Sequence, residues 1–333
     1  MENILITGGC GFLGQHLTKQ LLEKYPQAKI KLLDLFDNPQ PIHSFKKDKR
    51  VTYGLGKNIC NYDEIKNEFK DIDVVFHLAG IVSFWIKDKD KLFSVNVKGS
   101  KNVFQAAKNN KVKRFIHISS VAALGYNNKK HQAINEEFKF NWKIAQRYKK
   151  YYMLSKYLAD KELIQNRKGI NLNVVYPGLM LGPGDHNNSG KLLNSIKNGQ
   201  IPFYTPGGTN LMDVRDVANG LIAVLENGKR DEDYLLSGYN LTFKKQFEII
   251  AKVLKVNPPK RKLPLFSLRI LYPLVLALEK RAKERPKLTS DNLHSSFKFR
   301  YFDNSKAQQQ LNWKMEIPFH QTIQDTYNWM KSQ

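Results

Sequence analysis

The sequence predicts an α/β fold: a doubly wound parallel sheet followed by a smaller, mainly helical C-terminal domain. Two observations support this prediction. Short runs of Val, Ile, Leu and Phe with little polar alternation, as in strands buried on both faces, alternate with amphipathic helical stretches through the first half. A glycine-rich turn also joins the first apolar run to the first helical stretch. Repeated strand–helix units require parallel strands with right-handed crossovers.

The apolar runs and the helical patterns can be placed in order along the chain. The predicted strands are residues 3–7, 30–34, 73–79, 114–119 and 172–177. The predicted helices between them are residues 12–24, 62–69, 92–109 and 147–165. After residue 177 come the turn-rich segments "PGLMLGPGDHNNSG" and "TPGGTN", with further helices predicted at 191–198, 214–226, 243–254 and 265–284.

This change in character divides the chain into two interleaved parts. We expect residues 1–177, with sheet elements returning around 211–237, to form the larger domain. Residues 178–210 and 238–333 are expected to form the smaller domain, and no clean linker separates the two.

The composition is that of a soluble globular protein. Of the 333 residues, 41% are hydrophobic and 25% are charged. Cys10 and Cys60 are the only cysteines, too few for a disulfide framework, so a reducing cytoplasm is the expected location. The N-terminal "MENILITGG" enters an apolar strand after three residues, which predicts no secretion signal.

The net charge of +24 raises the question of a nucleic-acid partner. The lysines recur along the whole chain, however, and a lysine-biased proteome explains them about as well as a partner does. No basic-aromatic module or recognition motif accompanies the charge. We therefore predict no nucleic-acid partner.

The glycine-rich turn has the pattern of a phosphate-binding loop. In "ITGGCGFLG", Gly8, Gly11 and Gly14 follow the first strand, and Phe12 and Leu13 open the helix. Glycines let the backbone turn tightly and approach a pyrophosphate, whose charge then lies at the helix N-terminus. The pattern predicts a Rossmann-type site for a dinucleotide.

An acidic residue indicates which dinucleotide. Asp34 follows Gly14 by 20 residues, at the end of the second strand. A carboxylate there accepts hydrogen bonds from ribose hydroxyls and repels a 2′-phosphate, so NAD is favoured over NADP. The evidence against this choice is a group of nearby cations: Lys46, Lys47, Lys49 and Arg50.

The segment "YYMLSK", residues 151–156, contains a Tyr-x-x-x-Lys pair. Positions i and i+4 share one face of a helix, so Tyr152 and Lys156 point together, whereas Tyr151 is turned away by about 100°. The spacing alone is weak evidence. It recurs at Tyr25/Lys29, Tyr53/Lys57, Tyr62/Lys66, Tyr126/Lys130, Tyr157/Lys161 and Tyr327/Lys331.

The motifs together resemble those of the extended branch of the short-chain dehydrogenase/reductase superfamily, the NAD-dependent epimerase/dehydratase group. "TGGCGFLG" resembles its T-G-G-x-G-F-x-G loop, "DVVFHLAG" its D-x-V-x-H-L-A-A strand and "NVKGSKNV" its N-V-x-G-T-x-N helix. "HISSVAALG", "YMLSK" and "YPGLMLGPGD" resemble the serine strand, the Y-x-x-S-K helix and the R-P-x-x-x-x-G-P-G loop. These motifs span residues 3–185 in the family's order, and "VRDVANG" and "FDNSKAQQQLNW" extend the likeness to about residue 313.

The resemblance implies a role for each matching residue. Ser120, with Ser119 as the near alternative, Tyr152 and Lys156 take the catalytic positions. The positions implied to bind the cofactor are Gly8, Gly11, Phe12, Leu13, Gly14, Asp34, Asn58, Ile59, Leu78, Ala79, Gly80, Tyr152, Lys156, Pro177 and Gly178. Asn58 and Ile59 fall beside the adenine, although the family usually has an aspartate where Asn58 stands. Pro177 and Gly178 fall at the nicotinamide end.

These residues predict a hydride-transfer reaction. The pKa of a free phenol is about 10, and we expect a neighbouring ammonium and oxidised nicotinamide to lower the pKa of Tyr152. Ser120 would hydrogen-bond the substrate oxygen while Tyr152 gives or takes its proton. The resemblance also implies that Lys156 binds the nicotinamide ribose.

Two positions argue against a nucleotide-sugar substrate. Leu179 stands where the resembling sugar enzymes offer an asparagine toward the diphosphate, and Thr209 stands where they have an arginine. "ERPKLTSDNL" resembles the E-P-x-L-T-x-x-x-V run of dihydroflavonol-reductase, hydroxysteroid-dehydrogenase and hopanoid-associated members. A hydroxy or keto group of a sterol-, isoprenoid- or long-chain-like substrate is therefore predicted. A nucleotide-sugar 4-epimerase or dehydratase and a non-catalytic NAD-binding regulator are the alternatives.

Residues 260–287 form a basic, apolar segment. Between Leu263 and Leu278 only Ser267 and Arg269 are clearly polar, and the segment carries nine Lys and Arg against two Glu, a net +7. A helix that caps the substrate pocket is the favoured interpretation. The alternative is a helix lying on an anionic membrane surface.

Two further predictions concern histidines and assembly. His77 is expected to be a packed, hydrogen-bonded strand residue, and the spacing of the eight histidines suggests no metal site. In the resembling family, the helices at 92–109 and 147–165 are where a dimer forms, so a homodimer is expected.

Overall fold

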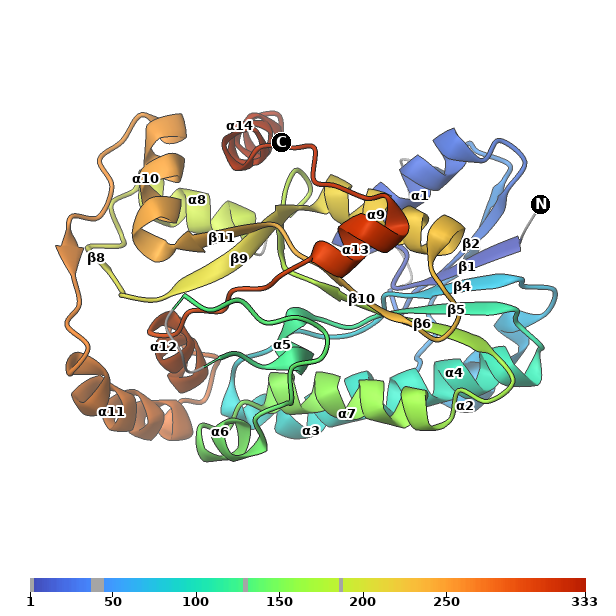
Figure 1. Cartoon of the computed structure of the whole chain (residues 1–333), viewed down its shortest axis with the longest axis horizontal. Helices are drawn as coiled ribbons and strands as arrows, with labels where there is room; N and C mark the ends of the chain where they lie inside the picture. The colour runs from blue at the N-terminus through green and yellow to red at the C-terminus, as the bar shows by residue number, and fades with distance from the viewer. Residues whose placement is uncertain (1–2, 37–44, 128–130, 186–187) are drawn as a thin grey trace.

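The computed structural model describes residues 3–36, 45–127, 131–185 and 188–333 (Figure 1). Within them, seven parallel strands form the main sheet in the order β10-β6-β5-β4-β1-β2-β3. The strands are β1 (Asn3–Thr7), β2 (Lys29–Leu33), β3 (Val51–Gly54), β4 (Val74–His77), β5 (Arg114–Ile118), β6 (Asn171–Pro177) and β10 (Asp233–Leu236). The strand order reverses between β1 and β4, which is where doubly wound sheets bind their ligands. The predicted fold class is confirmed.

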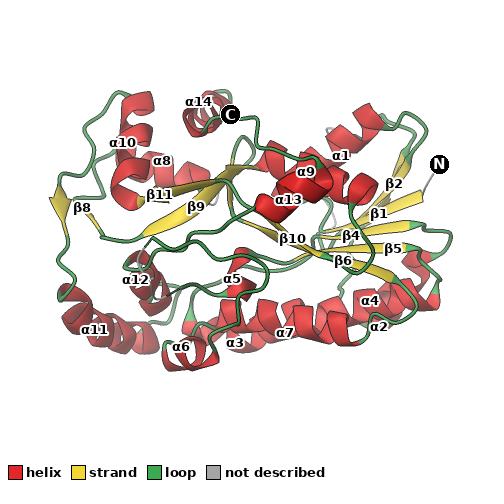
Figure 2. Cartoon of the chain, in the orientation of Figure 1, coloured by secondary structure: helices red, strands yellow, loops and turns green. Residues whose placement is uncertain are grey.

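Helices cover both faces of this sheet (Figure 2). On one face α1 (Phe12–Lys24) and α9 (Val214–Asn227) pack together, joined by α13 (Ser305–Leu311). The other face is covered by α2 (Tyr62–Ile65), α4 (Ser100–Asn109) and α7 (Tyr151–Gln165). Each face buries its own apolar cluster, which explains why the strands lack polar alternation.

The second part of the chain is a mixed layer beside the carboxyl ends of the main strands. A three-stranded sheet contains β7 (Leu179–Leu181), β9 (Gly208–Asp213) and β11 (Tyr239–Thr242), and a two-stranded one contains β8 (Phe203–Tyr204) and β12 (Arg261–Lys262). A third apolar cluster lies among α8 (Ser189–Lys197), α10 (Phe243–Leu254) and α14 (Phe319–Lys331). At the edge lie α11 (Ser267–Arg281) and α12 (Ser290–Ser296), with α3 (Lys89–Leu92), α5 (Val121–Leu124) and α6 (Trp142–Arg147) nearby.

Some elements differ from their prediction for local reasons. The helix predicted over 92–109 contains a π-helical stretch, Phe93–Gly99, before α4 begins. The helix predicted over 147–165 begins only at Tyr151, because Lys149 has a left-handed backbone (φ 49°) that ends α6. Strand β3 and helix α14 were missed; β3 is only four residues long and one of them, Thr52, is exposed.

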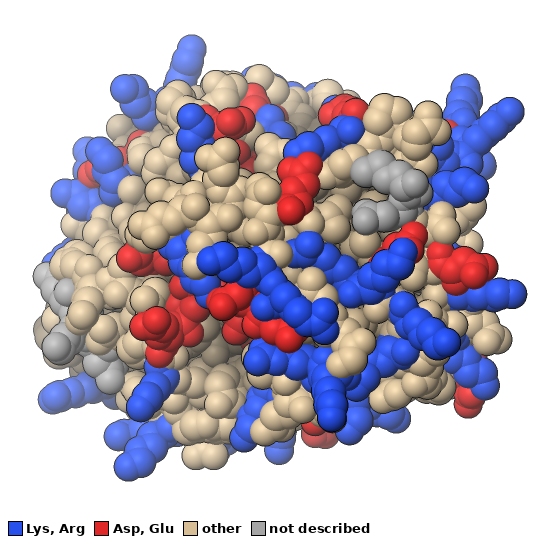
Figure 3. Space-filling view, turned by 45° about the vertical axis from the view of Figure 1, so that its right-hand side comes forward, with Lys and Arg blue, Asp and Glu red and all other residues tan. Residues whose placement is uncertain are grey.

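The positive charge is spread out on the face shown in Figure 3. Lys and Arg side chains cover much of this face, with Asp and Glu side chains between them. Such a distribution differs from the single basic stripe of many nucleic-acid-binding surfaces. The expected cytoplasmic location and the expected homodimer stay predictions.

A buried ion pair joins the main domain to α12. Lys150, directly before α7, is fully buried, and its Nζ donates to Oδ1 of Asp291 (2.6 Å) and to Oγ of Ser295 (2.7 Å). Asp291 is itself 3% exposed. The start of α7 is therefore held against α12 by a charge pair that water does not screen.

Removing one partner of this pair should be costly. We expect Lys150→Met to lower the free energy of unfolding by about 3–5 kcal/mol, because the carboxylate of Asp291 is left buried and unpaired. The matched control is Lys101→Met, which breaks an ion pair with Glu162 in which the lysine is 63% exposed, and should cost about 1 kcal/mol or less. Urea unfolding measures both; equal losses in the two variants would contradict the prediction.

Candidate active site

The glycine loop lies at the carboxyl end of β1, where backbone must approach backbone closely. Gly8 has a φ of +67°, and a Cβ there would lie 2.9 Å from the backbone of Ala79. A Cβ on Gly14 would collide with the carbonyl of Gly9. Gly11 is the N-cap of α1 and supplies no side-chain cap, so the first N–H groups of this helix remain available for an anion.

The two residues that open α1 pack on opposite sides. Leu13 is buried in the core, and Phe12 is half-buried, with its ring 5.7 Å from that of His16 and close to Gly182 and Gly184. The N-terminal turn of α1 is thus fixed against the loop that follows β7.

Asp34 lies directly after β2 and faces the glycine loop. Its Oδ2 accepts a hydrogen bond from the N–H of Cys10 (3.0 Å), and its Oδ1 accepts one from the N–H of Leu35 (2.8 Å). The guanidinium of Arg50 is instead bonded to Asp48 and to the carbonyl of Leu22. Arg50 is therefore committed to a structural role.

Other predicted cofactor residues surround this loop. Ile59 is buried against Gly99, where a Cβ would lie 2.7 Å from its Cδ1. Asn58 is exposed and accepts a hydrogen bond from the N–H of Cys60 (2.9 Å). After β4 the chain becomes progressively more exposed through Leu78 and Ala79 to Gly80.

The end of β6 is tightly constrained. Pro177 and Gly178 are buried, and a Cβ on Gly178 would collide with Oδ1 of Asn210. Asn210, on β9, accepts from the N–H of Gly238 (2.8 Å) and donates to Oδ1 of Asn240 (2.8 Å). This junction between the two sheets therefore needs a residue without a side chain.

The geometry distinguishes the two adjacent serines after β5. Ser119 is buried, and its Oγ donates to Oδ2 of Asp160 (2.7 Å). Ser120 is the N-cap of α5, is partly exposed and hydrogen-bonds the side chain of Tyr152. Ser120 thus lies beside the predicted catalytic tyrosine, and Ser119 is bound elsewhere.

Tyr152 lies in the first turn of α7 and is buried against the ring of Phe84 at 5.6 Å. Burial raises the pKa of its phenol, although the hydrogen bond with Ser120 acts in the opposite direction. The predicted lowering of this pKa by an ammonium and oxidised nicotinamide together does not hold in the protein without nicotinamide, where burial is the largest cause of the shift and raises the pKa. Tyr151, one residue earlier, is only half-buried and lies under the ammonium of Lys89.

Lys156 is also buried, one turn further along α7. Its Nζ donates to the carbonyl of Ile118 (3.1 Å), and a Cβ on Gly80 would lie 3.4 Å from it. Burial lowers the pKa of this ammonium, whereas the carboxylate of Asp160 raises it. The lysine therefore lies between the end of β5 and the loop after β4.

Asp160 is a residue that sequence reasoning missed. It is buried one further turn along α7 and accepts from Ser119 and from Nε2 of His117 (3.1 Å). Burial raises the pKa of its carboxyl, against the effect of Lys156. Its position four residues after Lys156 was the available signal, since i and i+4 share a face.

Asn96, in the π-helical stretch, was missed as well. Its side chain bonds the N–H (2.9 Å) and the carbonyl (3.1 Å) of Ile81 and donates to Oγ of Ser155 (3.0 Å). It thereby fixes the loop after β4 to α7. π-Helical turns are frequent at functional sites, but their presence is not visible in a hydrophobic pattern.

His77 has the packed role predicted for it. It is fully buried, with Nδ1 bonded to Oγ1 of Thr7 (2.7 Å) and Nε2 bonded to Oγ of Ser100 (2.8 Å). Among the residues that the structure describes, no three His, Cys, Asp or Glu side chains are grouped as metal ligands.

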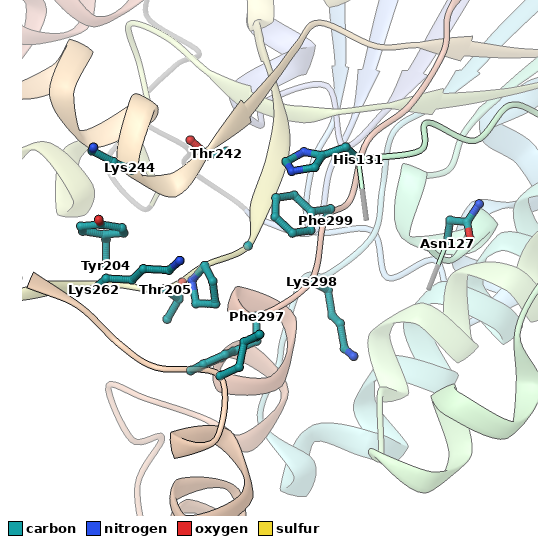
Figure 4. Close-up of a pocket in the computed structure, with 13 residues that line it drawn as sticks. Asn127, His131, Tyr204, Thr205, Thr242, Lys244, Lys262, Phe297, Lys298 and Phe299 are labelled. Atoms are coloured by element: carbon teal, nitrogen blue, oxygen red, sulfur yellow. The ribbon is translucent and has the colours of Figure 1, made fainter. Parts of the chain in front are cut away.

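A cavity of about 550 Å³ lies in the C-terminal layer (Figure 4). Its walls combine apolar, uncharged polar and basic residues, and none of the lining residues carries a carboxylate. They are formed by Asn127, His131, Tyr204, Thr205, Pro206, Gly207, Thr242, Lys244, Lys262, Leu265, Phe297, Lys298 and Phe299. One wall residue, Asn127, follows Ser120 by seven residues in the chain, four of which form α5.

The coupling of Asp160 to Lys156 gives a testable pH effect. Because the carboxylate of Asp160 raises the pKa of Lys156, Asp160→Asn should lower that pKa, so that the ammonium is lost at lower pH. NMR titration of ¹³C-labelled lysine measures it, with Lys156→Arg identifying the signal. Asp71→Asn, at an exposed position, is the control. An unchanged titration in Asp160→Asn would show that the two groups are uncoupled.

Comparison with known proteins gives the family. The 3-beta hydroxysteroid dehydrogenase/isomerase family matches residues 5–224, which is more than half of the chain. A putative dihydroflavonol 4-reductase of Synechocystis sp. is 27% identical over 98% of this chain and 94% of its own. The decarboxylating sterol-4-alpha-carboxylate 3-dehydrogenase of Schizosaccharomyces pombe is 25% identical over 100% of this chain and 98% of its own.

Solved structures have the same fold. The crystal structure of gox2253 is similar with a TM-score of 0.81 and 26% identity, over 100% of this chain and 98% of that one. A dTDP-glucose 4,6-dehydratase of Bacillus anthracis has a TM-score of 0.77 at 17% identity, over 100% and 97%. The resemblance predicted from the motifs is confirmed. The chain therefore belongs to the 3-beta hydroxysteroid dehydrogenase/isomerase family and is an NAD-dependent enzyme of the extended short-chain dehydrogenase/reductase type.

Proposed function

We propose that this enzyme transfers hydride between NAD and a hydroxy or keto group of an apolar, sterol-, isoprenoid- or long-chain-like molecule. The observation that carries the proposal is the buried phenol of Tyr152, hydrogen-bonded to Ser120, with Lys156 one helical turn away beside Gly80. These groups lie near the carboxyl ends of β4 and β5, next to the point where the strand order reverses.

The cofactor fits the residues around the glycine loop. The uncapped N-terminus of α1 offers N–H groups to a pyrophosphate. Gly8, which lies close to the backbone of Ala79, has no side chain that could obstruct the approach of the pyrophosphate. Asp34 would accept the ribose hydroxyls. When bound, NAD supplies the hydride acceptor or NADH the donor.

The protein's own groups move the proton. Since burial raises its pKa, Tyr152 carries its proton at neutral pH and can give it to the substrate oxygen during reduction. In the oxidative direction the phenol must first release its proton to solvent, and the phenolate then takes the proton of the substrate hydroxyl; the positive charge of bound NAD would favour that phenolate. Ser120 holds the substrate oxygen toward the phenol. Lys156 would bind the nicotinamide ribose; its Nζ is held by the carbonyl of Ile118, and the carboxylate of Asp160 raises its pKa.

An apolar substrate is supported by the lining of the C-terminal layer. Thr209 is buried within β9, and Leu179 lies on the neighbouring strand β7, so neither position offers a charged contact to a diphosphate. Phe297 and Phe299 line the cavity together with Leu265. The names of two relatives refer to a sterol carboxylate and a dihydroflavonol, which agrees with a large ring compound.

The reaction can be tested with a substrate panel. Incubation with NAD and sterols, isoprenoid alcohols or long-chain hydroxy acids should produce NADH, seen as absorbance of the reduced nicotinamide. Interconversion of nucleotide sugars without net NADH would favour the epimerase alternative instead. Binding of NAD without turnover of either class would favour a regulator.

Replacing the phenol should stop turnover without loss of cofactor. We expect Tyr152→Phe to lower kcat by about 10²–10⁴-fold, because the proton donor is removed, while NAD binding stays within a few-fold. Tyr151→Phe is the matched control on the next residue and should retain activity. Normal turnover by Tyr152→Phe would refute the proposed mechanism.

The preference for NAD should depend on the charge of Asp34. Asp34→Asn keeps an acceptor for the N–H of Cys10 but removes the repulsion of a 2′-phosphate. The ratio of the Kd for NADP to that for NAD should fall by about tenfold or more. Asp231→Asn, distant in the fold beyond α9, serves as the control. An unchanged ratio would mean that another group selects the cofactor.

A further inference from the structure

Helix α11 exposes a row of large apolar side chains. Phe266, Ile270, Leu274 and Leu278 recur every four residues, and with the preceding Leu265 each is 54–68% exposed. Residues four apart advance by about 40° around a helix, so the four side chains form one continuous face. Figure 1 places α11 at one end of the molecule, outside α12. We call this row the α11 apolar face.

The opposite side of α11 fixes its orientation. Glu279 is 1% exposed and accepts hydrogen bonds from the N–H of Ile86 (3.0 Å) and of Ser290 (2.8 Å). The ring of Tyr272 packs edge-on against Tyr148 at 5.3 Å. The polar anchor therefore faces inward and the α11 apolar face faces outward. That this helix caps the substrate pocket stays a prediction; of residues 260–287, Lys262 and Leu265 line the cavity, and both precede α11.

The flanks of this helix carry uncompensated positive charge. Residues 260–287 contain nine Lys and Arg, and none forms an ion pair with any part of the chain that the structure describes. Of the two glutamates, Glu279 is buried and engaged by backbone N–H groups. An exposed apolar face this large, with cations around it, marks an interaction surface.

We propose that α11 docks this enzyme onto the surface of an anionic lipid membrane. The α11 apolar face would enter the boundary between headgroups and acyl chains, and the nine cations would contact anionic headgroups. A second copy of the chain is a poor occupant, because a symmetric contact would bring two segments of net +7 together. No helix in the described ranges is long and apolar enough to cross a membrane.

The position of the cavity supports a lipid surface over an acidic protein. Leu265 and Lys262 line the cavity and lie just before α11 in the chain. A docked α11 would place this end of the cavity near the acyl region, where an apolar molecule is dissolved. This link to the substrate rests on the proposed function, whereas docking itself rests on the exposed face and the charge.

Vesicle flotation tests the docking. At low salt the protein should float with vesicles of phosphatidylserine and phosphatidylcholine and remain behind with phosphatidylcholine alone, and added salt should weaken the association. The double variant Ile270→Gln/Leu274→Gln should bind about tenfold or more weakly. The matched control is Leu35→Gln/Phe36→Gln, which alters side chains that are 56% and 67% exposed outside α11.

A second pair of variants tests whether the positive charge beside α11 matters, because both variants lose the same net charge. Lys280→Gln/Arg281→Gln/Lys283→Gln should weaken vesicle binding, whereas Lys29→Gln/Lys98→Gln/Lys168→Gln, at exposed positions elsewhere, should leave most of it. Equal effects of the two triple variants, or no flotation of the wild type at low salt, would overturn the proposal. The proposal would also be overturned if the wild type bound no vesicles but formed a dimer in ultracentrifugation, and if Ile270→Gln/Leu274→Gln dissociated that dimer.

The outcomes separate docking from catalysis. NAD-dependent turnover without vesicle binding would end the docking proposal and leave the proposed function. Vesicle binding through α11 without turnover of any substrate in the panel would support the docking proposal and contradict the proposed function.

Discussion

The buried ion pair between Lys150 and Asp291 is the contact on which the arrangement of the site depends. It fixes the start of α7, and Tyr152 lies only two residues further along. It also fixes α12, whose first residue, Ser290, bonds Glu279 of α11. The chain beyond α12 continues through Phe297 to Phe299 along the cavity wall. One buried ion pair therefore aligns α7, which carries Tyr152, with the cavity wall and with α11.

The part of the fold that the sequence predicted well is the part governed by local rules. Buried parallel strands need continuous apolar runs, and a pyrophosphate loop needs glycine where Gly8 and Gly14 meet other backbone. Both constraints act on residues that are neighbours in the sequence, so a sequence pattern is enough to identify them. The family match, which ends at residue 224, covers the same region.

The details that the sequence did not predict arise from burial and from contacts distant in the chain. The direction of the Tyr152 pKa shift depends on how deeply the phenol is buried, and a motif carries no such information. Asp160 and Asn96 acquire their roles because they meet Ser119 and Ile81, which are 41 and 15 residues away. The sequence placed Ser120 first and kept Ser119 as an alternative, and only the contact of Ser119 with Asp160 distinguishes the two. The exposure of α11 is a property of packing, so composition alone left two interpretations open.

The junction at Gly178 has a consequence for how such an enzyme can change over evolution. Any side chain there would displace the amide of Asn210, which holds Gly238 and Asn240 in the second sheet. The main sheet and the three-stranded sheet thus meet at a position that accepts a single amino acid. Residues of the cavity wall and of α11 can be exchanged without this constraint, whereas any residue other than glycine at position 178 would disturb the contact between the two sheets.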